Sequence, residues 1–308
     1  MNILFILVLY PTLLNAISYR SDKKASDLIK NEYDERTKNN QTIKRLSDFD
    51  GTITTEILKD WGYDTDSIQI NLSYRGISAI EEGTFDEYSS LEKLDLYYNS
   101  ISTISESSFR GLVNLVELKL SNNRISTIEN GSFCMLKNLE ILDLSSNNIE
   151  EVHIGIFSGI KTLKVLDLFD NSILYIGDNA FEDLENLEAL YLENNMIEEI
   201  RLETFSGLKN LKNLVLWFNY LVFIEENAFL QLKNLEFLNI GFNIIEKIRK
   251  ETFAGLLNLH ELVLWYNQID YIEDNSFSCI QNLEILDLRN NLISEITIDM
   301  FRYTKVSF

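Results

Sequence analysis

Residues 139–152 read LEILDLSSNNIEEV, and this stretch decides the fold. Leu142 and Leu144 alternate with outward residues, which is the period-2 pattern of a half-buried β-strand. Asn147 follows where we expect the chain to turn inward, and its amide can satisfy turn backbone groups that no regular ladder reaches. The isoleucine and valine that close the stretch are expected to fill a layer behind the strand.

The same frame recurs every 24 residues along most of the chain. Asparagine keeps this step at Asn99, Asn123, Asn147, Asn171, Asn195, Asn219, Asn243, Asn267 and Asn291. Phenylalanine keeps it at Phe85, Phe109, Phe133, Phe157, Phe181, Phe205, Phe229, Phe253, Phe277 and Phe301. No insertion or deletion breaks the register, so the pattern predicts stacked coils whose strands form one parallel sheet.

The frame L-x-x-L-x-L-x-x-N-x-I-x-x-I resembles the leucine-rich-repeat family over residues 67–308. Its 24-residue length, with a Phe after the second Ile, is similar to the extracellular "typical" subtype of Toll-type receptors, chaoptin- and connectin-like adhesion proteins, Slit and small leucine-rich proteoglycans. The resemblance implies an α/β solenoid of about ten coils, a horseshoe with a parallel β-sheet on its concave face and an irregular or short helical convex side. It also implies a binding protein without enzyme activity.

The segments before the repeats suggest a secreted protein. Residues 1–18 are interpreted as a signal peptide, because the apolar run is too short to span a bilayer comfortably and small residues follow it. Residues 19–46 are polar and mixed in charge, which predicts a flexible arm. Residues 47–66 carry spaced apolar side chains and are expected to form an N-terminal cap without cysteines. No other stretch is apolar enough to be transmembrane.

The last coil is expected to lack a cap. Phe301 is followed by only seven residues, so the chain stops where another strand would begin. An apolar end would then be left open, either because the sequence is truncated or because another subunit covers it.

Composition excludes several functions. The formal net charge is −21 with no basic stripe, which argues against nucleic acid as a partner. The two cysteines, Cys134 and Cys279, lie six repeats apart and form no metal or redox motif. His153 and His260 lack ligand spacing, so we expect neither a metal site nor a cofactor.

The outward strand residues change character along the solenoid. They are polar and acidic in the first coils, whereas the later coils carry aromatic side chains. We expect the ligand-binding residues to be Val215, Trp217, Phe218, Phe237, Asn239, Gly241, Phe242, Val263, Trp265 and Tyr266. Exposed aromatic groups of this size are uncommon on soluble monomers and are typical interface anchors.

The spacing predicts a slot between Trp217 and Trp265. Adjacent strands lie about 4.8 Å apart, which puts the two indoles roughly 10 Å apart with Gly241 as the floor. The alternative interpretation is that the two rings fold over Gly241 and cover bare backbone. In that case Phe218, Phe242 and Tyr266 would likewise turn into the hinge of each coil.

Two further motifs need an interpretation. Residues 48–52, DFDGT, resemble the D-x-D-G-T signature of haloacid-dehalogenase-type phosphotransferases, but a turn of Asp, Gly and Thr explains them equally and no α/β domain follows. Sequons at Asn40, Asn71 and Asn130 predict glycosylation, although three sequons in an Asn-rich chain also arise by accident. A glycan at Asn71 would direct binding toward the later coils.

The sequence therefore supports two main hypotheses. The first is a secreted protein that recognises a protein or glycan ligand on its concave face, with innate immune recognition or cell adhesion as the roles that the resemblance implies. The second is an extracellular assembly subunit that forms a homo- or hetero-dimer through its uncapped C-terminal coil. A phosphotransferase using the DFDGT segment is a remote third.

Overall fold

A computed structural model of the protein describes residues 49–301. Within this range, residues 51–301 belong to one compact unit. The expected signal peptide, the polar arm, the sequon at Asn40 and the first aspartate of the DFDGT segment lie outside the described residues.

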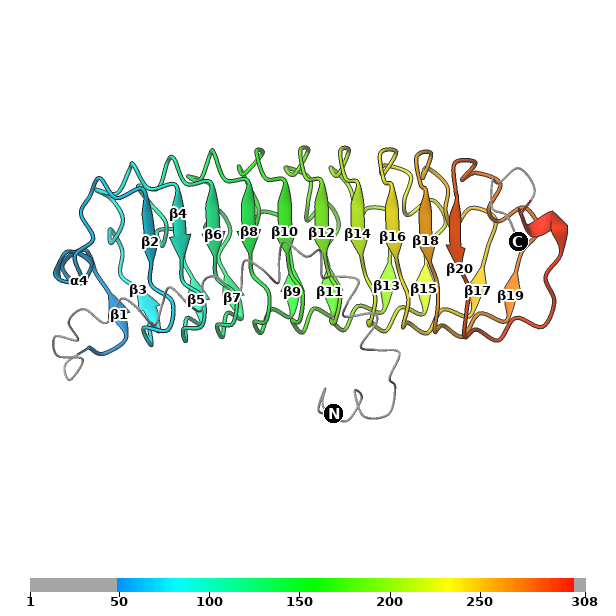
Figure 1. The fold of residues 1–308 in the computed structure, drawn as a ribbon, viewed down its shortest axis with the longest axis horizontal. Coiled ribbons are helices and arrows are strands. Elements are labelled where there is room, and N and C mark those ends of the chain that lie inside the picture. The colour runs from blue at the N-terminus through cyan, green and yellow to red at the C-terminus, as the bar shows by residue number, and fades with distance from the viewer. Residues whose placement is uncertain (1–48, 302–308) are drawn as a thin grey trace. The chain divides into compact units, whose positions relative to one another are not determined.

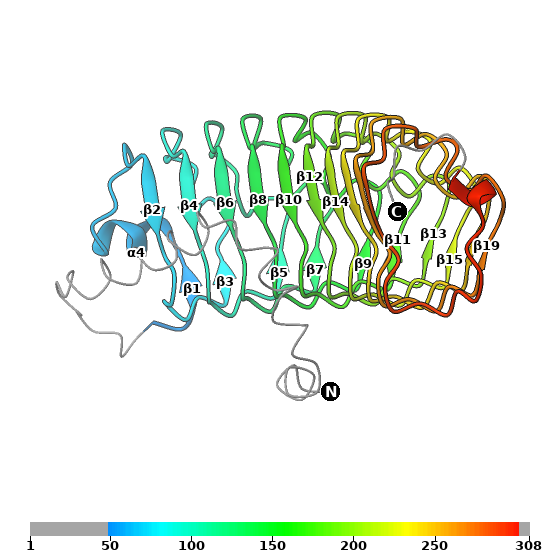
Figure 2. The same cartoon turned by 45° about the vertical axis from the view of Figure 1, so that its right-hand side comes forward.

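Ten short parallel strands lie side by side in chain order (Figure 1). They are β2 (Gln69–Asn71), β4 (Lys93–Asp95), β6 (Glu117–Lys119), β8 (Ile141–Asp143), β10 (Val165–Asp167), β12 (Ala189–Tyr191), β14 (Asn213–Val215), β16 (Phe237–Asn239), β18 (Glu261–Val263) and β20 (Ile285–Asp287). Each residue pairs with the one 24 positions later, as Leu166 does with Leu190. The row of coils curves, with this sheet on the concave side (Figures 1 and 2).

The return side of each coil consists of turns and two-residue strands. Figure 2 looks along the last coils and shows these strands on the wall opposite the sheet. They are β3 (Ala79–Ile80), β5 (Thr103–Ile104), β7 (Thr127–Ile128), β9 (Glu151–Val152), β11 (Tyr175–Ile176), β13 (Glu199–Ile200), β15 (Phe223–Ile224), β17 (Lys247–Ile248) and β19 (Tyr271–Ile272). From β5 onward they pair in parallel twos.

The expected irregular convex side is therefore confirmed, and it contains little helix. Between the cap helix and the final 3₁₀ turn η2 (Ile298–Phe301), residues 61–297 contain no helix. Residues with positive φ interrupt the return segments, among them Gly131 (φ 80°) and Asn179 (φ 58°). A left-handed residue ends a helical turn, so the convex segments cannot extend into helices.

The core consists of leucines, isoleucines and a column of phenylalanines. The leucines of the strands are almost fully buried through β18. Successive phenylalanine rings stack from Phe109 to Phe181 and from Phe205 to Phe301, with centroids 5.3–6.4 Å apart and interplanar angles of 8–14°. One coil alone could not cover these rings, so stability comes from the contacts between neighbouring coils.

The expected role of the repeated asparagine is confirmed. The Nδ2 of Asn147 donates to the carbonyls of Leu120 and Leu144, each at 3.0 Å. Its Oδ1 accepts from the amide of Ile125 at 2.9 Å. The same pattern repeats from Asn99 to Asn291. Each side chain thus ties its own turn to the preceding coil through backbone groups that are otherwise buried and unpaired.

A second row of amides joins the coils, and the sequence analysis missed it. Its donors lie 25 residues after their acceptor carbonyls, at 2.8–3.0 Å, and are Asn114, Asn138, Asn186, Asn210, Asn234, Asn258 and Asn282. At the corresponding position of the coil that lacks this asparagine, the hydroxyl of Thr162 donates the equivalent hydrogen bond. The sequence contains the signal for this second row, because these asparagines also recur at a step of 24 residues.

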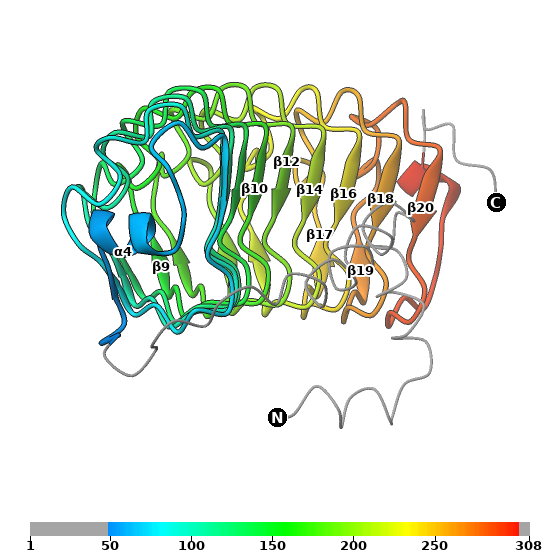
Figure 3. The ribbon, with the colours of Figure 1, turned by 60° about the vertical axis from the view of Figure 1, so that its left-hand side comes forward.

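The N-terminal end is covered by a short strand and a helix. Strand β1 (Thr52–Ile53) pairs with β3, and helix α4 (Thr55–Asp60) begins after an N-cap formed by Thr54. Ile53 and Leu58 are fully buried. Figure 3 shows α4 against the open end of the first coils.

The DFDGT segment leads into this cap. The carbonyl of Gly51 accepts from the amides of Ser78 and Ala79 at 2.7 and 3.2 Å. After Thr52 the chain continues into α4 and the first coil, where a phosphotransferase would need an α/β domain. These contacts give Gly51 and Thr52 a structural role.

Candidate functional site

Three neighbouring strands position the expected binding residues. In β14, β16 and β18 the central leucines Leu214, Leu238 and Leu262 are fully buried. Because side chains alternate along a strand, the residues on either side face the concave surface. The 24-residue register then places Trp217, Gly241 and Trp265 in one row across the three coils.

A second row follows directly, in the left-handed region of backbone space. Phe218, Phe242 and Tyr266 have φ values of 59°, 49° and 50°. Positive φ is unfavourable for side chains of this size, so the surrounding turn must hold it. The amides of Phe218 and Phe242 donate to the carbonyls of Gly241 and Trp265, in the next coil, at 3.1 and 2.9 Å.

The rings of both rows form one continuous group, which we call the aromatic cluster: Trp217, Phe218, Phe242, Trp265 and Tyr266. Phe242 lies at its centre, stacked on Tyr266 at 4.5 Å and edge-on to Trp265 at 4.7 Å. Trp217 contacts Phe218 and Phe242 at 5.8 and 6.2 Å. All five side chains are partly exposed.

The expected slot between the two indoles is wrong. A Cβ built on Gly241 would lie 2.4 Å from both Cδ1 and Nε1 of Trp265, so that indole lies directly over the glycine. Gly241 itself is buried. Trp265 thus covers bare backbone, as the alternative reading proposed for both rings, and the surface is a filled aromatic face instead of an open groove.

Replacing Gly241 by alanine is expected to displace the Trp265 indole. The new Cβ would occupy the indole position, which costs roughly 1–3 kcal/mol of stability when the ring moves. We expect a red shift of tryptophan fluorescence and a lower urea midpoint. In a Trp265→Ala background the same substitution should cost little, and an equal cost in both backgrounds would refute this packing.

The remaining expected residues support the cluster. Val215 and Val263 are buried, so they offer little contact area to a ligand. Asn239 accepts a hydrogen bond from the Gly241 amide through its Oδ1 at 3.0 Å, which fixes the backbone beside the cluster. Phe237 is partly exposed one strand position before the buried Leu238.

The coils before the cluster present carboxylates held by hydrogen bonds. Asp143 accepts from the hydroxyls of Ser121 and Ser145 at 2.8 and 2.6 Å. Asp170 accepts from the Ser146 hydroxyl at 2.9 Å and from the Asn194 amide at 2.5 Å. The concave face is therefore acidic and polar on one side of the cluster.

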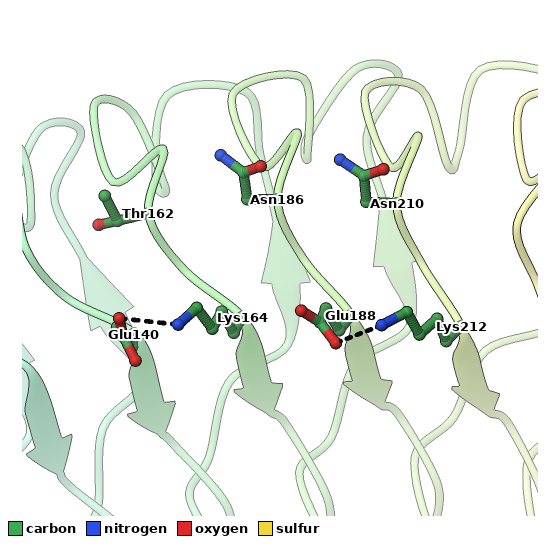
Figure 4. A pocket seen from close by; sticks show the side chains of 7 residues that line it. All are labelled: Glu140, Thr162, Lys164, Asn186, Glu188, Asn210 and Lys212. Carbon is green, nitrogen blue, oxygen red and sulfur yellow. Dashed lines mark hydrogen bonds and ion pairs between the residues drawn. The ribbon is translucent and has the colours of Figure 1, made fainter.

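A shallow hollow of about 300 Å³ crosses four coils at the start of their strands (Figure 4). Glu140 pairs with Lys164 at 2.8 Å, and Glu188 pairs with Lys212 at 2.7 Å. The hydrogen bond between the second pair lowers the pKa of Glu188 and raises the pKa of Lys212. The charges compensate one another, so this row contributes to register and is a weaker candidate than the aromatic cluster.

The two described sequons are exposed. Asn71 lies on β2, where its Oδ1 accepts from the backbone amide and hydroxyl of Ser73 at 2.9 and 2.6 Å. Asn130 is exposed on a return segment. Glycosylation stays a prediction.

Residues 49–301 contain no cluster of three or more His, Cys, Asp or Glu side chains that could hold a metal ion. Within the same range no helix is long and apolar enough to cross a membrane.

Comparisons with known proteins agree with the repeat pattern. The model of the family described as "Leucine rich repeat" matches residues 69–125, 107–149, 137–197, 185–245 and 235–293. A chain in a solved structure of the Toll–Spatzle complex, described as a molecular hub in Drosophila development and innate immunity, is similar with a TM-score of 0.64 and 20% identity. The match covers 82% of this chain and 38% of that one. No curated protein matches.

Proposed function

The chain belongs to the leucine-rich repeat family, and we propose that it is a secreted recognition protein whose aromatic cluster binds a protein or glycan ligand on the concave face. The cluster is the observation that carries the proposal. Its five rings contact one another on the concave face and remain partly exposed. Interface hot spots are enriched in such side chains, particularly Trp and Tyr.

The wider biological role rests on resemblance. Secretion rests on the apolar leader of residues 1–18. The similar chain occurs in a complex that is linked by its description to development and innate immunity. We therefore propose extracellular binding in innate immune recognition or cell adhesion, with the fold as the common element.

Affinity capture from extracellular fluid tests the proposal. Trp217→Ala/Trp265→Ala should weaken the binding of ligands that the wild-type protein retains by tenfold or more, because the loss of a single anchor worth about 1.4 kcal/mol is already a tenfold change. Tyr175→Ala/Tyr271→Ala is the matched control, since both tyrosines are exposed on return strands. Circular dichroism must show that both variants fold. Retention of the same ligands by the cluster variant would refute the proposal.

The last coil offers a second candidate function, as an assembly subunit. In the described residues Ile285, Leu292 and Ile296 are more than half exposed there. Dimerisation through this coil stays a prediction. Sedimentation velocity over a range of protein concentrations distinguishes it from a monomeric recognition protein.

A further inference from the structure

One coil carries exposed apolar residues beyond the concave face. After the buried Asn219, the chain presents Tyr220, Val222 and Phe223, which are 56%, 51% and 47% exposed. Leu221 and Ile224 between and after them point into the core. The three exposed side chains therefore lie on the outside of the coil where it turns toward β15.

This composition is peculiar to the coil that also carries Trp217. The coil before it holds Met196, Glu198 and Glu199 at the three positions, and the coil after it holds Ile244, Glu246 and Lys247. In no other coil of the sequence are all three positions apolar. A single coil thus combines an aromatic concave residue with an apolar outer edge.

The edge residues continue the aromatic cluster. Trp217 contacts Phe218 at 5.8 Å, and Tyr220 follows two residues later, within about 7 Å of chain. Only Asn219 and Leu221 interrupt the run, and both are buried. We call Trp217, Phe218, Tyr220, Val222 and Phe223 the apolar belt, which starts on the concave face and passes around the edge of the solenoid.

Charged side chains flank the belt in both neighbouring coils. Glu198 and Glu246 occupy the position of Val222 in the two neighbouring coils, and both are exposed. Neither forms an ion pair within the described residues. Among the neighbouring cations, Arg201 and Arg249 are paired with Glu199 and Glu226, whereas the exposed Lys247 forms no ion pair within the described residues. Carboxylates without a cation partner in residues 49–301 therefore flank the belt on both sides.

We propose that the apolar belt docks a basic protein segment, which places apolar side chains on the belt and lysine or arginine beside Glu198 and Glu246. The inference rests on the proposed function and specifies its ligand. A second copy of the chain would bring the same formal charge of −21 and is disfavoured. A basic partner instead gains from charge complementarity, which steers association.

The extent of the belt favours a protein over a glycan. Residues 217–223 span up to about 23 Å of extended chain and turn from one side of the coil to the next. A ligand seated only on the concave face would contact Trp217 and leave Tyr220, Val222 and Phe223 in water. An extended segment of a protein can contact both sides of the edge.

The test uses two defined probes, a displayed library of random 16-residue peptides and an array of neutral and acidic glycans. The edge variant is Val222→Ser/Phe223→Ser, and the concave variant is Trp217→Ala/Trp265→Ala. Leu174→Ser/Tyr175→Ser is the matched control, because these residues hold the same positions two coils earlier and are 51% and 37% exposed.

We expect the wild-type protein to enrich basic peptides with an apolar residue. Both the edge variant and the concave variant should weaken the binding of an enriched peptide about tenfold or more, and the control should not. Glu198→Gln/Glu246→Gln should slow association several-fold at low salt, an effect that disappears at high salt.

The other outcomes separate the two proposals. Loss of peptide binding in the concave variant alone would overturn the belt and leave the proposed function standing. Unchanged binding in both variants would overturn both. Enrichment of neutral or acidic peptides, or binding of glycans without any peptide, would overturn the inference of a basic protein partner.

Discussion

Asn171→Ala is expected to destabilise the protein by about 3–6 kcal/mol, because one substitution leaves several buried backbone groups without a partner. The Nδ2 of Asn171 donates to the carbonyls of Leu144 and Leu168 at 3.0 and 3.2 Å. Its Oδ1 accepts from the amide of Ile149 at 3.0 Å. Alanine supplies none of these bonds, and the buried site excludes water that could replace them.

Urea unfolding followed by circular dichroism measures this loss. The control is Asn210→Ala, in the outer amide row, where the exposed side chain makes a single bond to the carbonyl of Glu185 at 2.8 Å. Its loss should cost about 1 kcal/mol, since water can hydrate the freed carbonyl. Equal losses for the two variants would show that the inner asparagines do not hold the coils together as described.

Phe229→Ala is expected to cost about 3–5 kcal/mol, the usual range for emptying a phenylalanine site in a packed core. Phe229 is fully buried and stacks between Phe205 and Phe253, at 6.0 and 6.4 Å. A cavity here separates the coils on its two sides. Because coils are stabilised chiefly by their neighbours, we also expect a broader unfolding transition.

The comparison for this prediction is Phe223→Ala, at the first position of the same coil's return strand β15. Phe223 is 47% exposed, so its removal should change stability by less than about 1 kcal/mol. A large loss at Phe223 would mean that the belt is part of the core, and its use as a docking surface would fail with it. Melting temperatures of both variants are sufficient to decide.

Much of the architecture follows from the sequence alone. The alternation of Leu142 and Leu144, the 24-residue step of the asparagines and the column of phenylalanines predicted the strands, the turns and the core that the structure contains. These features are set by spacing within one coil and by the repetition of that spacing. A strict period of 24 residues determines the backbone path of each coil. It also determines which residue of the next coil lies beside a given residue.

The surface was only partly predictable, for a physical reason. Spacing placed Trp217, Gly241 and Trp265 in one row, but the rotamer of Trp265 was decided by the empty space above a glycine in the neighbouring coil. The pairing of Glu140 with Lys164 and the exposure of Phe223 likewise depend on contacts between coils. Sequence periodicity therefore determined which residues are neighbours, and tertiary packing alone decided which of them cover one another and which remain exposed to a partner.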